Sequence, residues 1–171
     1  MNRNKFSAKD IALIGVMIAT LEVAKLAMSY LPNIELVTLL IIIYTLFFGK
    51  RIYYALAAFV LIEGCLYGFG LWWFMYLYIW PILAFLTRVF QKQQSVWFWS
   101  ILSGVYGLFY GALCSIVYIF TSGLKGAFAW WVAGIPFDII HCVSNFIICM
   151  VLFIPLRKVM RIMKNHMDTE D

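Results

Sequence analysis

Residues 137–156 read FDIIHCVSNFIICMVLFIPL. As a helix, this run is long enough to cross the roughly 30 Å hydrocarbon core of a bilayer. Asp138, His141 and Asn145 interrupt its first half, and their spacing of i, i+3 and i+7 places them on one helical face. An ionisable side chain that faces lipid is costly. We therefore expect this face to look into a helix bundle or a wet cavity, and we place the functional site there.

The composition predicts an integral membrane protein. Of the 171 residues, 65% are hydrophobic and 12% are charged, whereas soluble domains average about 45–50% and about 25%. We expect a single all-α membrane domain over residues 1–171, with no separate soluble domain. The net charge of +5 comes from basic residues at the ends of apolar runs, so it indicates membrane topology and not nucleic-acid binding. The four cysteines lie in apolar runs without a CxxC pair, which favours neither a disulfide framework nor a structural zinc site.

The apolar runs predict a bundle of six membrane-spanning helices. We expect the spans at about residues 11–31, 34–48, 52–71, 73–87, 96–120 and 136–156, followed by a basic cytoplasmic tail over 157–171. Ser7 and Asp10 resemble a capping box at the start of the first span. The second apolar run is short, so it needs its flanking residues, a tilt or burial behind its neighbours. Glycines 104, 107 and 111 are spaced for close helix approach.

The basic residues predict the orientation. If the N-terminus is cytoplasmic and the chain crosses six times, one side receives eleven of the thirteen basic residues: Arg3, Lys5, Lys9, Lys50, Arg51, Arg88, Lys92, Arg157, Lys158, Arg161 and Lys164. Five spans would destroy this asymmetry. The positive-inside rule therefore predicts six spans with both termini in the cytoplasm.

Polar and aromatic residues then gather at the outer end of the bundle. An aromatic block over residues 72–81 and the pair Trp130-Trp131 lie there, as do the carboxylates of the first three spans. We expect an outward-facing ligand pocket that is closed beneath, because a channel needs a polar lining through both leaflets. The candidate ligand-binding residues are Glu35, Glu63, Trp72, Trp73, Tyr76, Trp130, Trp131, Asp138, His141 and Asn145.

Each candidate also has a structural explanation. The aromatic residues are of the kinds that form interfacial belts. Glu22 and Lys25, at i and i+3, can neutralise each other. Asp138 can be a first-turn residue favoured by its helix dipole, and His141 can be a hydrogen-bonded bundle residue. Glu63 has no basic residue close to it in sequence.

A stripe of small residues lies on the first span. Ala8, Ala12, Gly15 and Ala19 recur at spacings of four, three and four. Such a stripe allows another helix to approach closely. It indicates either packing inside the bundle or a docking face for a partner helix, separate from the ligand site.

With these features the chain resembles the S component of an energy-coupling factor (ECF) transporter over its whole length. The resemblance rests on the small-residue stripe, the turn at residues 32–35, the Gly49-Lys50-Arg51 turn, the block at residues 72–81 and the segment 134–138. It implies docking of the stripe on a transmembrane coupling (T) protein, two cytoplasmic ATPases as further partners, and a vitamin or metal ion as ligand in a bacterial plasma membrane. Gly15 stands where the family has Ala. The chain has no G-x-x-x-x-G-K-[ST] motif, so we expect no enzymatic activity in this subunit.

The resemblance is closest to the cobalamin-type S components of lactobacilli. An aromatic pocket with one His and few cations suits a large ligand with amide groups, so cobalamin is the expected ligand, with no permanently bound cofactor or metal. Pantothenate is the next candidate, and a pyridoxine or pyrimidine precursor the third. The chain lacks the N-terminal Met-His site of the nickel and cobalt type.

Three other classes remain open from the sequence. A membrane enzyme could use Asp138 and His141 as an acid–base pair. An ion-coupled transporter could use Glu22, Glu63 and Asp138 as proton carriers, although residues 1–86 and 87–171 show no internal repeat. A structural scaffold would leave the outer polar cluster unexplained.

Overall fold

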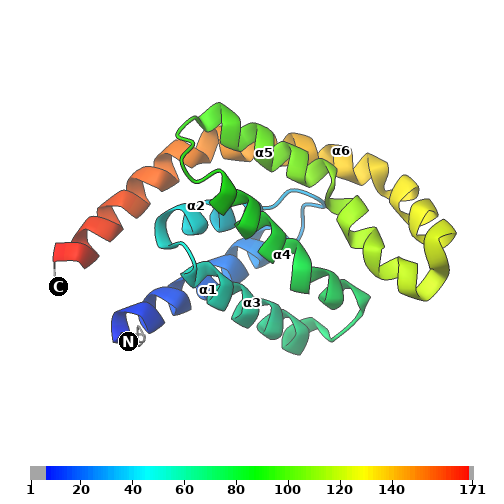
Figure 1. Ribbon diagram of the computed structural model, residues 1–171, viewed down its shortest axis with the longest axis horizontal. Helices are drawn as coiled ribbons and strands as arrows, with labels where there is room; N and C mark the ends of the chain where they lie inside the picture. Colours follow the sequence, from blue (N-terminus) through cyan, green and yellow to red (C-terminus); the bar gives the residue numbers. More distant parts are fainter. Residues whose placement is uncertain (1–6, 170–171) are drawn as a thin grey trace.

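The computed structural model describes residues 7–169, and these residues form helices and short connections without a β-strand (Figure 1). Arg3, Lys5, Glu170 and Asp171 lie outside the described residues. The helices are α1 (Ala8–Met28), α2 (Val37–Phe48), α3 (Arg51–Tyr67), α4 (Leu71–Val89), α5 (Val96–Leu108) and α6 (Tyr110–Thr169).

The helices are compatible with a membrane protein. Three stretches in the described part of the chain are long and apolar enough to cross a bilayer: Ala8–Met28, Leu71–Val89 and Val96–Met167. Many large apolar side chains on their outer faces are exposed, such as Ile11, Val23 and Val151. Lipid tails can cover such side chains, whereas a soluble bundle would bury them.

The start of α1 forms the predicted capping box. The Ser7 hydroxyl accepts the main-chain N–H of Asp10 at 3.1 Å, and the Asp10 carboxylate accepts the main-chain N–H of Ser7 at 3.0 Å. Two N–H groups that lack helical partners are thereby satisfied. Asp10 also pairs with Arg51 at 2.7 Å, which joins the start of α1 to the start of α3.

Helix α2 forms the centre of the core. Its 12 residues extend only about 18 Å at 1.5 Å per residue, too short to cross a bilayer unaided. Leu39, Ile41, Ile42 and Ile43 are almost completely buried, and α2 contacts α1, α3, α4 and α6. Burial behind neighbouring helices, one of the conditions expected for this short run, is therefore met.

The helix boundaries differ from the expected spans after residue 96. The expected helix over 96–120 is interrupted at Phe109, which separates α5 from α6. Gly123 has φ 69° and divides α6 into residues 110–122 and 124–169. Only a residue without a side chain adopts this backbone conformation easily. The second part of α6 then continues past Pro136, where a helix start was expected, and past Leu156, so that most of the expected tail is helical.

Glycines bring α5 and the start of α6 against the second part of α6. A Cβ atom added to Gly107 would lie 2.8 Å from the His141 carbonyl oxygen, and one added to Gly104 would lie 3.1 Å from that of Cys142. At Gly111 it would collide with the Asp138 carboxylate. The predicted close approach is therefore present, with main chain packed against main chain.

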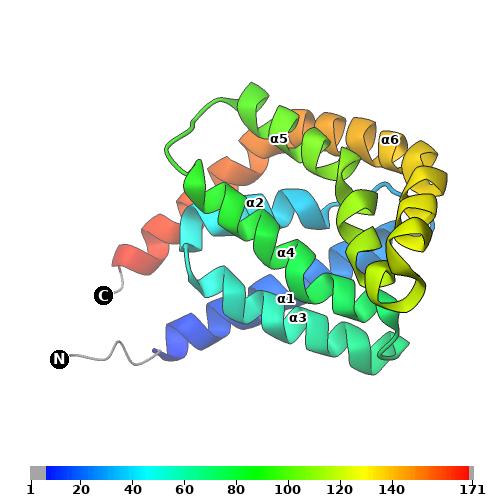
Figure 2. The same ribbon diagram turned by 45° about the vertical axis from the view of Figure 1, so that its right-hand side comes forward.

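Successive connections alternate between the two ends of the bundle. The start of α1 and the end of α6 lie at the same end of the molecule (Figures 1 and 2). One cavity at that end is lined by residues from the start of α1, the α2–α3 turn and the end of α6, and another by the α4–α5 connection and α6. The α1–α2 connection lies at the opposite end, beside the first turns of α4. The described basic residues Lys9, Arg51, Arg157, Arg161 and Lys164 thus gather at one end.

The glycine seam gives the first prediction. Gly107→Ala should lower the free energy of unfolding by about 1–3 kcal/mol, because the new methyl group meets fixed main-chain atoms. Gly134→Ala is the matched control, since a Cβ there meets nothing within 4 Å and Ala is the better helix former. The midpoint of thermal unfolding in detergent measures both. Equal midpoints for the two variants would contradict close α5–α6 packing.

Candidate functional site

A cavity of about 340 Å³ opens at the end of the bundle opposite the basic residues. It lies between the end of α1, the α1–α2 connection, α4 and α6. Its lining consists of Lys25, Met28, Ser29, Leu31, Pro32, Asn33, Ile34, Glu35, Val37, Tyr76, Trp80, Tyr110 and His141. Charged, aromatic and main-chain polar groups therefore converge on one hollow of the size of a small-molecule site.

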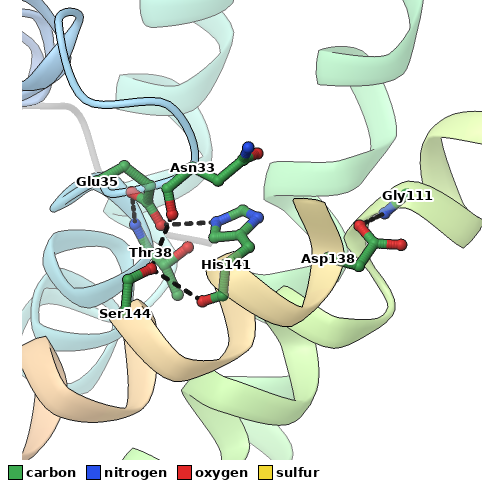
Figure 3. A network of polar contacts seen from close by, with 7 residues as sticks. All are labelled: Asn33, Glu35, Thr38, Gly111, Asp138, His141 and Ser144. Atoms are coloured by element: carbon green, nitrogen blue, oxygen red, sulfur yellow. Dashed lines mark hydrogen bonds and ion pairs between the residues drawn. The ribbon is translucent and has the colours of Figure 1, made fainter. Parts of the chain in front are cut away.

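Glu35 and His141 form the polar centre of the cavity (Figure 3). The His141 Nε2 lies 3.4 Å from Glu35 Oε1, and the main-chain N–H of Thr38 donates to Glu35 Oε2 at 2.8 Å. Both oxygens of the Glu35 carboxyl group therefore have a polar partner within the chain.

The α1–α2 connection is attached to α6 at the same place. The Ser144 hydroxyl donates to the carbonyl oxygen of Asn33 at 2.7 Å (Figure 3). Asn33 has φ 59°, a left-handed conformation that Asn tolerates better than most residues, and the turn predicted at Pro32-Asn33 is present. Two polar contacts, at Asn33 and Glu35, therefore attach this connection to α6 beside the cavity.

Aromatic rings form one wall of the cavity. The rings of Tyr76 and Trp80 on α4 lie edge to face at 5.3 Å, Trp80 lies 5.9 Å from Tyr110, and Tyr110 lies 4.8 Å from the His141 ring. Tyr76 was among the predicted residues, but Trp80 and Tyr110 were not. Trp80 follows Tyr76 by four residues, so helical spacing was a signal that could have identified it. Tyr110 directly follows the break between α5 and α6 at Phe109, and no proline or glycine at that position signals the break in the sequence.

Lys25 supplies a cation to the rim of the cavity. Its ammonium group forms an ion pair with Glu63 of α3, and it lies 5.0 Å from the ring centre of Tyr76 and 5.5 Å from that of Trp72. Glu63 is only 1% exposed, whereas Lys25 is 32% exposed. The partner that Glu63 lacks in sequence is thus Lys25 of α1. The ammonium group has both a counterion and aromatic faces that favour its charge.

Asp138 lies on the same face of α6 as His141 but makes a different contact. Its Oδ1 accepts the main-chain N–H of Gly111 at 2.9 Å (Figure 3). Gly111 is in the first turn of α6, whose N–H groups have no partners within that helix. The alternative that Asp138 is a first-turn residue of its own helix is wrong, because α6 continues through Pro136; Asp138 instead accepts a hydrogen bond at the N-terminus of the helix that begins at Tyr110.

The remaining candidates lie outside the cavity lining. Trp73 donates to the Val60 carbonyl oxygen at 2.8 Å. Trp130 stacks on Tyr118 at 4.7 Å, and Trp131 packs edge to face on Phe128. Asn145 is buried further along α6. The structure thus brings together Glu35, Tyr76 and His141 in the lining, with Trp72 and Glu63 beside Lys25.

The small-residue stripe of α1 lies on the surface of the bundle. All four residues of the stripe are exposed: Ala8, Ala12, Gly15 and Ala19. A Cβ atom added to Gly15 would meet nothing within 4 Å. No helix of this chain therefore packs on Gly15 within the described residues.

Neither a metal-binding cluster among the described residues nor a similar known protein indicates a function. Within residues 7–169, no three His, Cys, Asp or Glu side chains gather in a way that could hold a metal ion. Comparison with protein-family models, curated proteins and solved structures gives no match. The cavity, its lining and the exposed stripe are therefore the features that bear on function.

The ion pair at the rim gives the second prediction. Lys25→Met should destabilise the protein by up to about 3 kcal/mol, because it leaves a buried carboxylate without a counterion. The double variant Lys25→Met/Glu63→Gln removes both charges and should recover most of this loss. Unfolding midpoints of the two variants, measured against Glu63→Gln alone, test the pair. A double variant no more stable than Lys25→Met would show that Glu63 does not depend on Lys25.

Proposed function

We propose that this protein is the substrate-binding S component of an ECF-type uptake transporter. In this proposal it spans the plasma membrane of a bacterium six times, has both termini in the cytoplasm, and takes its ligand from outside the cell. The observation that carries the proposal is the 340 Å³ cavity with Glu35, His141 and Lys25 in its lining, at the end opposite the basic residues. Alternating connections and a common end for both termini support an even number of crossings.

The volume of the cavity favours a small ligand. Small-molecule pockets cover about 300–1,000 Å³, and this cavity lies near the lower limit. A pantothenate-sized or pyridoxine-sized ligand fits such a volume, with Lys25 for an anionic group and Glu35–His141 for hydroxyl or amide groups. Cobalamin, the ligand expected from the aromatic character, carries a corrin ring and a nucleotide tail. It requires the α1–α2 connection to move away from α6.

The proposed partners are a transmembrane coupling protein and two cytoplasmic ATPases. The exposed stripe on α1 supports this part of the proposal, because a partner helix can approach Gly15 without displacing anything in this chain. An acid–base enzyme that uses Asp138 and His141 as a pair receives less support. The Asp138 carboxylate is bound to Gly111, whereas His141 contacts Glu35.

The third prediction concerns the ligand. In calorimetric titration of the purified protein with pantothenate, pyridoxine and cobalamin, one of them should bind at micromolar or lower concentration. His141→Ala should weaken that binding about ten-fold or more, as expected for loss of a hydrogen bond to a charged network. His166→Ala is the matched control, since His166 is exposed and outside the lining. Equal affinity of the two variants would remove the cavity from the proposal.

The fourth prediction concerns the partner. In vesicles that also contain a coupling module, Gly15→Leu should abolish ATP-dependent uptake while the affinity of the isolated protein for its ligand is unchanged. Gly134→Leu, at the other helical glycine with open space around it, should leave uptake intact. If uptake proceeds without the coupling module, the protein is an independent transporter and the proposal fails.

A further inference from the structure

A second hollow lies at the basic end of the bundle, far from the ligand cavity in the fold. It has a volume of about 210 Å³ and lies between the end of α6 and the α4–α5 connection. Its lining consists of Leu46, Phe47, Gln91, Gln93, Gln94, Arg157, Arg161 and Lys164. We name it the basic groove. Arg157, Arg161 and Lys164 are spaced i, i+4 and i+7, so they share one face of α6.

The charges in the basic groove are not balanced. Its lining contains three cations and no carboxylate, and none of the three forms an ion pair with a described acidic side chain. Arg157 is held in place by the main-chain oxygen of Gln94 at 3.2 Å and by the side-chain oxygen of the same residue. Three neighbouring cations repel one another, so an anion between them would be stabilised.

If residues 137–156 cross the membrane, the groove lies at the depth of the lipid headgroups. Arg157 follows directly on the apolar run 137–156, whose length matches the hydrocarbon core of about 30 Å. After Arg157, α6 has one apolar face toward the core and further apolar side chains on its outer side. Met160 and Met163 pack on the core, while Val159 and Ile162 are about half exposed on the outer side. A helix with apolar side chains outward and cations to one side is typical of a membrane interface.

We propose that the basic groove binds the phosphate group of an anionic phospholipid. Arg157, Arg161 and Lys164 would meet the phosphate oxygens, and the amide groups of Gln91 and Gln93 can donate further hydrogen bonds. Basic pockets between membrane helices recognise headgroups in this way. Free phosphate has the same chemistry, but the place of the groove directly after the apolar run 137–156 favours a lipid. This inference does not depend on the proposed transport function.

The experiment uses the full chain in a neutral detergent. Phosphatidylglycerol, phosphatidylcholine and inorganic phosphate are titrated separately, and the midpoint of thermal unfolding is recorded. Phosphatidylglycerol should raise the midpoint of the wild type. In Arg161→Gln/Lys164→Gln the lipid concentration for half of the effect should rise about ten-fold or more. Lys50→Gln/Lys158→Gln loses the same charge from exposed positions outside the groove and should respond as the wild type does.

Equal responses of the two double variants would overturn the proposal, because binding would then follow net charge and not the groove. An equal effect of phosphatidylcholine would also overturn it. A response to inorganic phosphate without one to phosphatidylglycerol would overturn the lipid and identify a soluble phosphate ligand. The midpoints without lipid show whether each variant is folded. If the groove variant is too unstable to titrate, native mass spectrometry of Lys164→Gln against Lys158→Gln gives the same comparison of bound phosphatidylglycerol.

Discussion

Main-chain contact between two helices fixes the position of the polar face of α6. Gly107 lies against the carbonyl group of His141, and Gly111 lies against the Asp138 carboxylate. Helices in lipid gain little from burying apolar surface against one another, so close packing of small residues has a larger share in holding them together. With α6 fixed in height and rotation, His141 meets Glu35 and Asp138 meets the free N–H of Gly111. The cavity therefore depends on a contact outside it.

The buried charges connect parts of the chain that are distant in sequence. Lys25 and Glu63 join α1 to α3, and Asp138 joins the second part of α6 to its first turn. An unpaired charge in a low-dielectric interior costs several kcal/mol, so each pair strongly disfavours arrangements that separate its partners. The polar groups at this end thus have a structural role, and in the proposed function they also contact the ligand. Glu35 and His141 both line the cavity and also contact each other.

Periodicity and run length predicted much of this fold, because they depend on local spacing. The helical class, the face of Asp138, His141 and Asn145, and the glycine seam all follow from such spacing. The partner of Glu63 was not predicted in this way. Lys25 is distant from Glu63 in sequence, and Lys25 has a nearer acidic neighbour in Glu22. The break at Phe109 has no proline or glycine at that residue to signal it. Pro136 signals a helix start, but α6 passes through it, as membrane helices allow when neighbours satisfy the freed carbonyl group.

The two ends of the bundle differ in how their charges are balanced. At the cavity, Lys25 is paired with Glu63 and Glu35 with His141, whereas Arg157, Arg161 and Lys164 line one groove that contains no described acid. The charges around the cavity are balanced within the chain, whereas the lining of the basic groove contains no acid, and this difference is the reason for proposing an external anion at the groove alone. The α1–α2 connection supplies part of the cavity lining and is attached to α6 through contacts at Asn33 and Glu35. Because the glycine seam fixes α6, it also fixes the two points to which this connection is attached.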